Sequence, residues 1–185
     1  AGRYARAVRS GIAQAQPLEA EGLAWALQEV AFTRKQMSLD DLRAALAEQE
    51  AIIHAPGATD ESREVRMAMV NALAYRKLIG MAKAGQSLAP PTEVQGLRIG
   101  PIALLGSPFE TFQAIKNEVH EKARSPLPLM MGVTNDTPGY APDHTAAARG
   151  GYAADVVPLI LGSLPYANIH DELVASLLDV EAKLY

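Results

Sequence analysis

The sequence predicts an α/β fold in which amphipathic helices pack on a mixed sheet. Apolar residues recur at helical spacing over residues 38–55 and 60–85, which indicates two consecutive amphipathic helices. After Pro90 and Pro91 the period changes, and strand-like runs alternate with a helical one as far as residue 133. No repeat, low-complexity tract or linker interrupts the chain. We therefore expect residues 1–185 to form a single α/β body, with a sub-boundary near residue 90.

The composition supports a folded core and argues against several classes of protein. Hydrophobic residues make up 49% of the chain, and 17 basic against 21 acidic side chains give a net charge of -4. Because no basic stripe is present, we do not expect a nucleic-acid partner. No run approaches the roughly 20 apolar residues that cross a bilayer, so no transmembrane segment is predicted. The absence of Cys excludes disulfides and thiol nucleophiles.

The first third of the chain is predicted to contain a weak helix, a short strand and the start of a helical pair. Residues 2–16 mix Ala with cations and indicate the weak helix, while β-branched and aromatic residues within 23–35 favour the strand. Ser38 followed by Asp41 resembles a capping box that opens the next helix. A second helix is expected after Thr59 or Asp60, antiparallel to the first.

The centre of the chain is predicted to form a strand–helix–strand unit. Residues 94–99 and 102–105 indicate two short strands around a Gly-Pro turn, and helical spacing resumes at Glu110. The apolar run at residues 127–133, bounded by prolines, is a candidate buried strand. This order predicts a βαβ unit, and a last helix is expected after Asn168.

Residues 104–152 combine backbone-shaping residues with groups that can bind a ligand. Glu110 follows a predicted strand, where it either stabilises a helix N-terminus or presents a carboxylate at the strand-end edge of the sheet. Tyr140 ends the turn Asn135-Asp136-Thr137-Pro138-Gly139-Tyr140. Its ring either packs over the loop, or its phenolate becomes a ligand beside a cation.

Local motifs do not complete a catalytic site. No two histidines share metal-ligand spacing, so any metal site must be long-range or incomplete. Ser107 lacks the Gly-x-Ser-x-Gly context of a nucleophile elbow, and Gly150-Gly151 is too short to cradle a phosphate. Both are interpreted as elements that shape the backbone.

The runs LRIGPIALLGSPFETF, NDTPGY and GGY together resemble the C-terminal part of the catalytic domain of the neutral/alkaline (non-lysosomal) ceramidase family, closest to its short bacterial members. The resemblance covers about residues 97–152. It implies that Glu110 and Tyr140 bind zinc, and that Tyr152 and Asn135 support the site or substrate. Phe109 stands where the family has Gly, and Ala153 where it usually has Glu.

The resemblance implies a zinc-dependent amide hydrolase that converts N-acylsphingosine to sphingosine and a fatty acid, with an N-acyl lipid such as ceramide as substrate. The family's zinc-binding histidines and its active-site serine have no match here. We therefore expect this chain, which opens on Ala1, to be part of a larger catalytic domain, completed by a missing N-terminal segment or a companion chain. The resemblance is compatible with a secreted or periplasmic location, which the sequence does not fix.

Two alternatives remain open at this point. The chain could be a non-catalytic α/β interaction or scaffold module, because no complete ligand set is present and the amphipathic helices need a surface to cover. It could also be a divergent family member that has lost activity.

Overall fold

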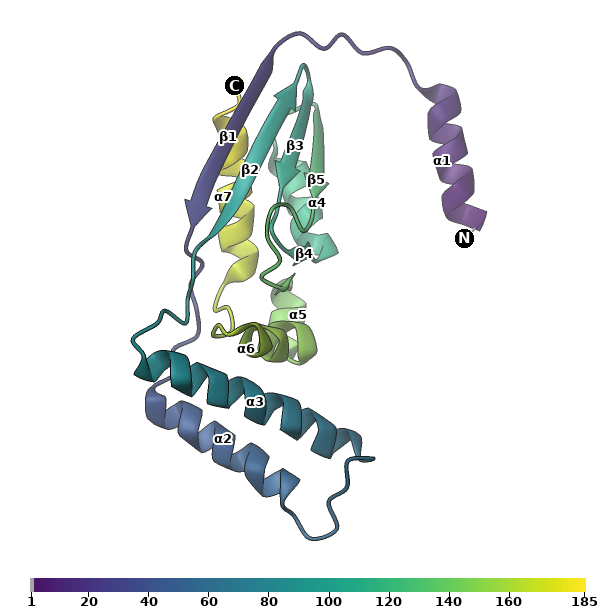
Figure 1. The fold of residues 1–185 in the computed structure, drawn as a ribbon. Helices are drawn as coiled ribbons and strands as arrows, with labels where there is room; N and C mark the ends of the chain where they lie inside the picture. Colours follow the sequence, from purple (N-terminus) through teal and green to yellow (C-terminus); the bar gives the residue numbers. More distant parts are fainter. Residues whose placement is uncertain (1) are drawn as a thin grey trace.

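The computed structural model describes residues 2–185 as an α/β body with a mixed sheet, which confirms the predicted fold class (Figure 1). Its elements in chain order are α1 (Gly2–Gln14), β1 (Leu23–Val30), α2 (Leu39–Ile53), α3 (Arg63–Lys83), β2 (Thr92–Ile99), β3 (Ile102–Gly106), β4 (Glu110–Thr111), α4 (Gln113–Lys122), β5 (Leu127–Met131), β6 (Tyr140–Ala141), α5 (His144–Arg149), the π-helical turn η1 (Tyr152–Val156), α6 (Val157–Leu161) and α7 (Ile169–Ala182).

The main sheet has the strand order β1-β2-β3-β5. Strands β1, β2 and β3 are antiparallel neighbours, whereas β3 and β5 are parallel and are connected through α4. This is the strand–helix–strand unit that the sequence predicts. A second sheet of two short parallel strands, β4 and β6, lies at the carboxyl end of β3.

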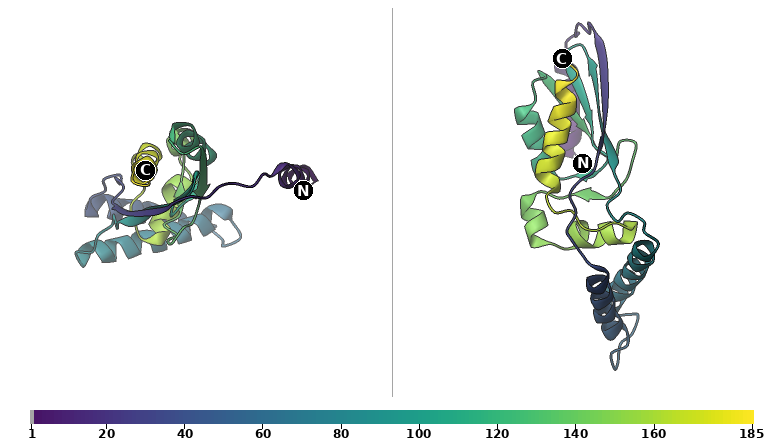
Figure 2. Two further views of the ribbon diagram at one scale, coloured as in Figure 1. Left: turned by 90° about the horizontal axis from the view of Figure 1, so that it is seen from above. Right: turned by 90° about the vertical axis from the view of Figure 1, so that its left-hand side faces the viewer.

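Helices cover one face of the main sheet, where α7 lies along the strands with α4 beside it (Figures 1 and 2). Gly96 of β2 lets α7 approach closely, because a Cβ there would lie 2.8 Å from Val180 Cγ1. Leu105, Leu173 and Leu177 are fully buried between these layers. Burial of such side chains contributes roughly 1.5–3 kcal/mol each.

The opposite face of the main sheet is open and strongly apolar, and we call it the open sheet face. It is built from cross-strand rows of facing residues: Leu23–Ile99–Ile102–Leu127, then Trp25–Leu97–Leu104–Leu129, then Leu27–Gln95–Gly106–Met131. Trp25 is 75% exposed, although the solvated face of an antiparallel sheet normally carries polar side chains. The residues of β5 that point to this face are exposed as well. The prediction that residues 127–133 form a buried strand is therefore wrong: β5 ends at Met131 and is covered on one face only.

Helices α2 and α3 form an antiparallel pair below the sheet (Figure 1). The predicted capping box is confirmed, since Ser38 Oγ accepts the Asp41 amide and the Asp41 carboxylate accepts the Ser38 amide. The second helix begins later than predicted, after Ser62 rather than after Thr59 or Asp60. None of the described helices combines the length and apolarity needed to cross a membrane.

Candidate functional site

Glu110 is exposed because consecutive side chains after β3 point alternately into the core and out of it. Phe109 is fully buried, with its ring centroid 5.4 Å from both Phe32 and Tyr166, while Glu110 next to it is exposed. In an extended segment consecutive side chains point to opposite sides. The bulk of Phe109 therefore enters the core, away from the side on which Glu110 is exposed.

Glu110 lies in strand β4, and the helix begins only at Gln113. The interpretation that Glu110 sits in the first turn of a helix is therefore wrong. Ser107 fixes the bend before it, because its buried hydroxyl accepts the Phe109 amide at 3.2 Å and bonds the Thr111 hydroxyl at 2.8 Å. These hydrogen bonds are consistent with the interpretation that Ser107 shapes the backbone.

The pairing of β4 with β6 sets Glu110 directly beside Tyr140. The Glu110 amide donates to the Gly139 carbonyl at 2.9 Å, and the Phe112 amide donates to the Ala141 carbonyl at 3.0 Å. Gly139 has a φ of 97°, and a Cβ there would lie 2.7 Å from Val157 Cγ1. Both constraints require glycine immediately before Tyr140.

Glu110, Tyr140 and Tyr152 line one pocket of about 240 Å³, and its other walls are mainly apolar. The rings of Tyr140 and Tyr152 are 6.4 Å apart and meet edge to face. The charge of the Glu110 carboxylate raises the pKa of Tyr140, and partial burial adds to that shift. Tyr140 is therefore a neutral phenol at neutral pH, and a nearby cation would be needed to make it a phenolate ligand.

Tyr152 comes into the pocket at the start of η1, directly after a turn made by two glycines. Gly150 and Gly151 both have positive φ, 71° and 100°. The Gly151 amide donates to the Asp155 carboxylate at 2.7 Å, and Asp155 also pairs with Lys35 at 3.0 Å. The double glycine thus shapes the backbone, consistent with its predicted role.

Asn135 is not among the residues that line the pocket. It is exposed and adopts a left-handed conformation with a φ of 62°, which Asn tolerates better than most residues. Its geometry is that of a turn residue, and its predicted support of site or substrate stays a prediction.

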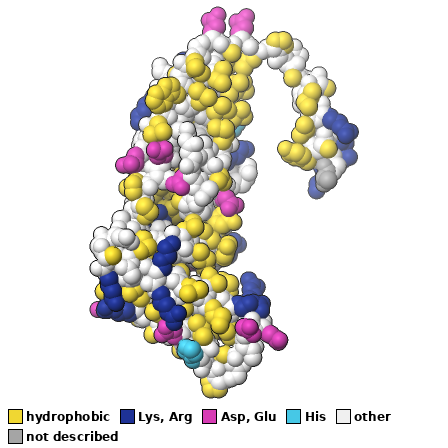
Figure 3. All heavy atoms as spheres, viewed as in Figure 1, with side chains coloured by type: hydrophobic (Ala, Val, Ile, Leu, Met, Phe, Trp, Pro, Cys, Tyr) yellow, Lys and Arg dark blue, Asp and Glu magenta, His cyan; other side chains and the backbone are white. Residues whose placement is uncertain are grey.

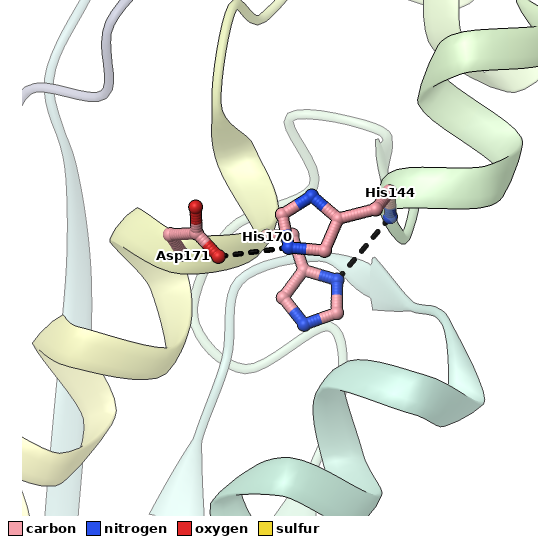
Figure 4. Close-up of side chains that lie close together, drawn as sticks. All are labelled: His144, His170 and Asp171. Atoms are coloured by element: carbon pink, nitrogen blue, oxygen red, sulfur yellow. Dashed lines mark hydrogen bonds and ion pairs between the residues drawn. The ribbon is translucent and has the colours of Figure 1, made fainter.

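The structure also brings together histidines that the sequence does not connect. His144 opens α5 and His170 lies in the first turn of α7, with their ring centroids 4.0 Å apart and nearly parallel (Figure 4). His144 Nε2 lies 2.8 Å from Asp171 Oδ1. His144, His170 and Asp171 form a cluster that could hold a metal ion, because their ligand atoms all lie within 4.8 Å of one another. It is the cluster of this kind that residues 2–185 contain.

The nitrogens of His170 already have partners. Its Nδ1 accepts the His144 amide at 3.3 Å, which leaves Nε2 to donate to Glu118 at 2.9 Å. Hydrogen bonds from Lys122 and then from His170 hold the pKa of Glu118 below its usual value. His170 is 5% exposed. Its two hydrogen bonds connect α7, which carries it, to α5 and α4. The cluster serves as a structural junction in this arrangement.

Little in the sequence points to this cluster. Both histidines follow an Asx residue at a helix start, Asp143 and Asn168, and the Asp143 side chain caps α5. That pattern locates the helices. It does not say that the two helix starts face each other.

Comparison with known proteins places limits on any assignment. No protein-family profile matches the chain, and no curated protein is similar at the sequence level. Among solved structures, the neutral ceramidase from Pseudomonas aeruginosa is similar, with 16% sequence identity and a TM-score of 0.47. The alignment covers 98% of this chain and 32% of that one, so the chain spans about a third of its length. This likeness concerns the fold alone and does not assign the chain to a family.

Proposed function

We propose that this chain supplies two oxygen ligands, Glu110 and Tyr140, to the zinc site of an amide hydrolase acting on an N-acyl lipid such as ceramide. The observation that carries the proposal is the β4–β6 pairing, which sets both side chains on one pocket at the carboxyl end of β3. Open α/β sheets place their ligands at this edge. The sequence motifs that resemble the ceramidase family involve the same residues.

The donor set is compatible with a zinc site that is only partly formed by this chain. Carboxylate oxygen is an established zinc ligand, and catalytic zinc sites use three or more protein ligands. Within residues 2–185 no other His, Cys, Asp or Glu groups with Glu110 at ligand spacing. The remaining ligands, expected to be histidines, would come from outside this chain.

A bound zinc would polarise the amide carbonyl and lower the pKa of a bound water from 15.7 towards about 7. The residues of this chain would orient and shield the substrate. Glu110 holds negative charge at the pocket, and Tyr140 keeps its proton until a cation lowers its pKa. Val133, Val157 and Leu161 line the same pocket, and their apolar surfaces suit an acyl chain and exclude water.

Metal analysis of the intact protein that contains this chain tests the proposal. We expect about one zinc per chain in the wild type and a strong loss in Glu110→Ala, because a charged ligand is removed. Glu121→Ala is the matched control, since Glu121 is an exposed carboxylate on α4 away from the pocket. Equal zinc content in all three proteins would reject the assignment.

A non-catalytic interaction module is the second candidate, and the open sheet face favours it. Large exposed apolar patches mark interaction sites in soluble proteins. Under this alternative, chelators would change neither the stability nor the association of the chain.

A further inference from the structure

Helix α1 stands apart from the body in this structure. It buries none of its residues, and Figure 1 shows it at the end of an extended connection. Helices of about this length are only marginally stable alone in water, because nucleation is costly. A surface that accepts the apolar side of α1 would therefore stabilise it.

The side chains of α1 divide into an apolar and a basic side. Tyr4, Val8 and Ile12 recur every fourth residue and form one stripe, and all three are exposed. Arg3, Arg6 and Arg9 occupy the rest of its surface, and α1 contains no acidic residue. Figure 3 shows the apolar atoms of this helix on one side and its cations on the other.

The open sheet face matches α1 in length. A helix of 13 residues is about 20 Å long, and the 8-residue strand β1 spans about 26 Å. Figure 3 shows apolar side chains gathered over the strands, on the face that α7 does not cover. Trp25 lies in the middle row of this face, opposite Leu97.

The open sheet face and α1 also carry complementary charges. The apolar rows end at Glu29 and Glu93, which are directly opposite each other on β1 and β2. Like charges in that arrangement are destabilising. Neither carboxylate has an ion-pair partner among residues 2–185. A helix laid along the face with its N-terminal turn at this end would bring the positive end of the helix dipole to them.

The connection to α1 is fixed where it leaves the sheet. The Gly100 amide donates to the Gly22 carbonyl at 3.0 Å, and a Cβ at Gly100 would lie 2.8 Å from Ala20 Cα. Residues 20–22 are thus held against the turn between β2 and β3. From there the chain crosses the end of the sheet and carries α1 away from its own open face (Figure 1).

We propose that α1 of one copy of this chain docks on the open sheet face of a second copy, and that the second copy returns the same contact. Each copy then contributes its α1 and its open sheet face, which closes the assembly as a two-fold dimer. The dimer covers the Trp25 row with Val8 and Ile12 and sets the N-terminal end of α1 beside Glu29 and Glu93.

The single Trp reports on this contact, because Trp25 is the only tryptophan in the chain and is 75% exposed. We expect the molecular mass to rise from 19.7 kDa towards twice that value with concentration. The emission of Trp25 should shift to the blue with the same midpoint. The measurement is sedimentation equilibrium alongside fluorescence on the whole chain.

Val8→Asp is the test variant and Ser10→Asp is its matched control on the opposite side of α1. Because α1 contacts no core residue, neither change can unfold the body. Val8→Asp should weaken dimerisation about a hundredfold, and Ser10→Asp should leave it within a few-fold. A monomer with exposed Trp25 at all concentrations would overturn the proposal. So would a monomer in which Trp25 is shielded and Val8→Asp exposes it, since α1 would then dock on its own sheet.

Discussion

The Glu110–Tyr140 pocket and the His144–His170–Asp171 cluster follow one another along the chain, but their polar atoms are used differently. Imidazole is the commonest metal-binding side chain, yet both nitrogens of His170 are engaged by Glu118 and the His144 amide. Glu110 and Tyr140 are less typical ligands, but both line a pocket. The comparison teaches that access to a pocket, rather than residue type, identifies a candidate binding site.

Removal of His170 should produce the largest effect, and that effect should be on stability. His170→Ala leaves the part-buried His144 amide and one Glu118 oxygen without their partner and removes a buried ring, which together costs about 2–3 kcal/mol. His144→Ala should cost below about 1 kcal/mol, because its pair with Asp171 is more than half exposed. Urea unfolding measures both. Loss of bound metal in His144→Ala without loss of stability would show that the cluster is a metal site after all.

A smaller effect is expected on the ionisation of Tyr140. Glu110→Gln removes the charge that raises the pKa of Tyr140, so that pKa should fall towards its ordinary value. In the wild type, the raised pKa of Tyr140 in the folded state stabilises the fold at pH values below the ordinary tyrosine pKa near 10. This contribution is lost as the pH rises through the folded-state pKa. Carbon-13 NMR of the tyrosine ring follows the titration, and Glu121→Gln is the control. An unchanged Tyr140 pKa in Glu110→Gln would show that the two side chains do not interact.

The sequence predicted those parts of the fold that depend on local signals. The α2 capping box, the β2–β3 hairpin around Gly100 and the β3–α4–β5 unit all follow from spacing and turn residues. The short strands β4 and β6 could not be predicted, because two-residue strands carry no period. Their pairing depends on the buried Phe109 and on the conformation of Gly139.

The candidate site was predictable in part, for the same reason. Glu110 and Tyr140 stand out beside shape-determining residues, so sequence motifs single them out. His144 and His170 are 26 positions apart, and only the packing of α5 against the start of α7 brings their rings together. The open sheet face was likewise hidden, since its rows appear only once the strand register is known.

The most direct test of the central claim is the location of zinc by anomalous scattering at the zinc edge, in crystals of the intact protein that contains this chain. We predict a single strong peak within about 2.0–2.2 Å of a Glu110 oxygen, with the Tyr140 hydroxyl on the same ion. A peak between His144 and Asp171, with none at Glu110, would contradict it.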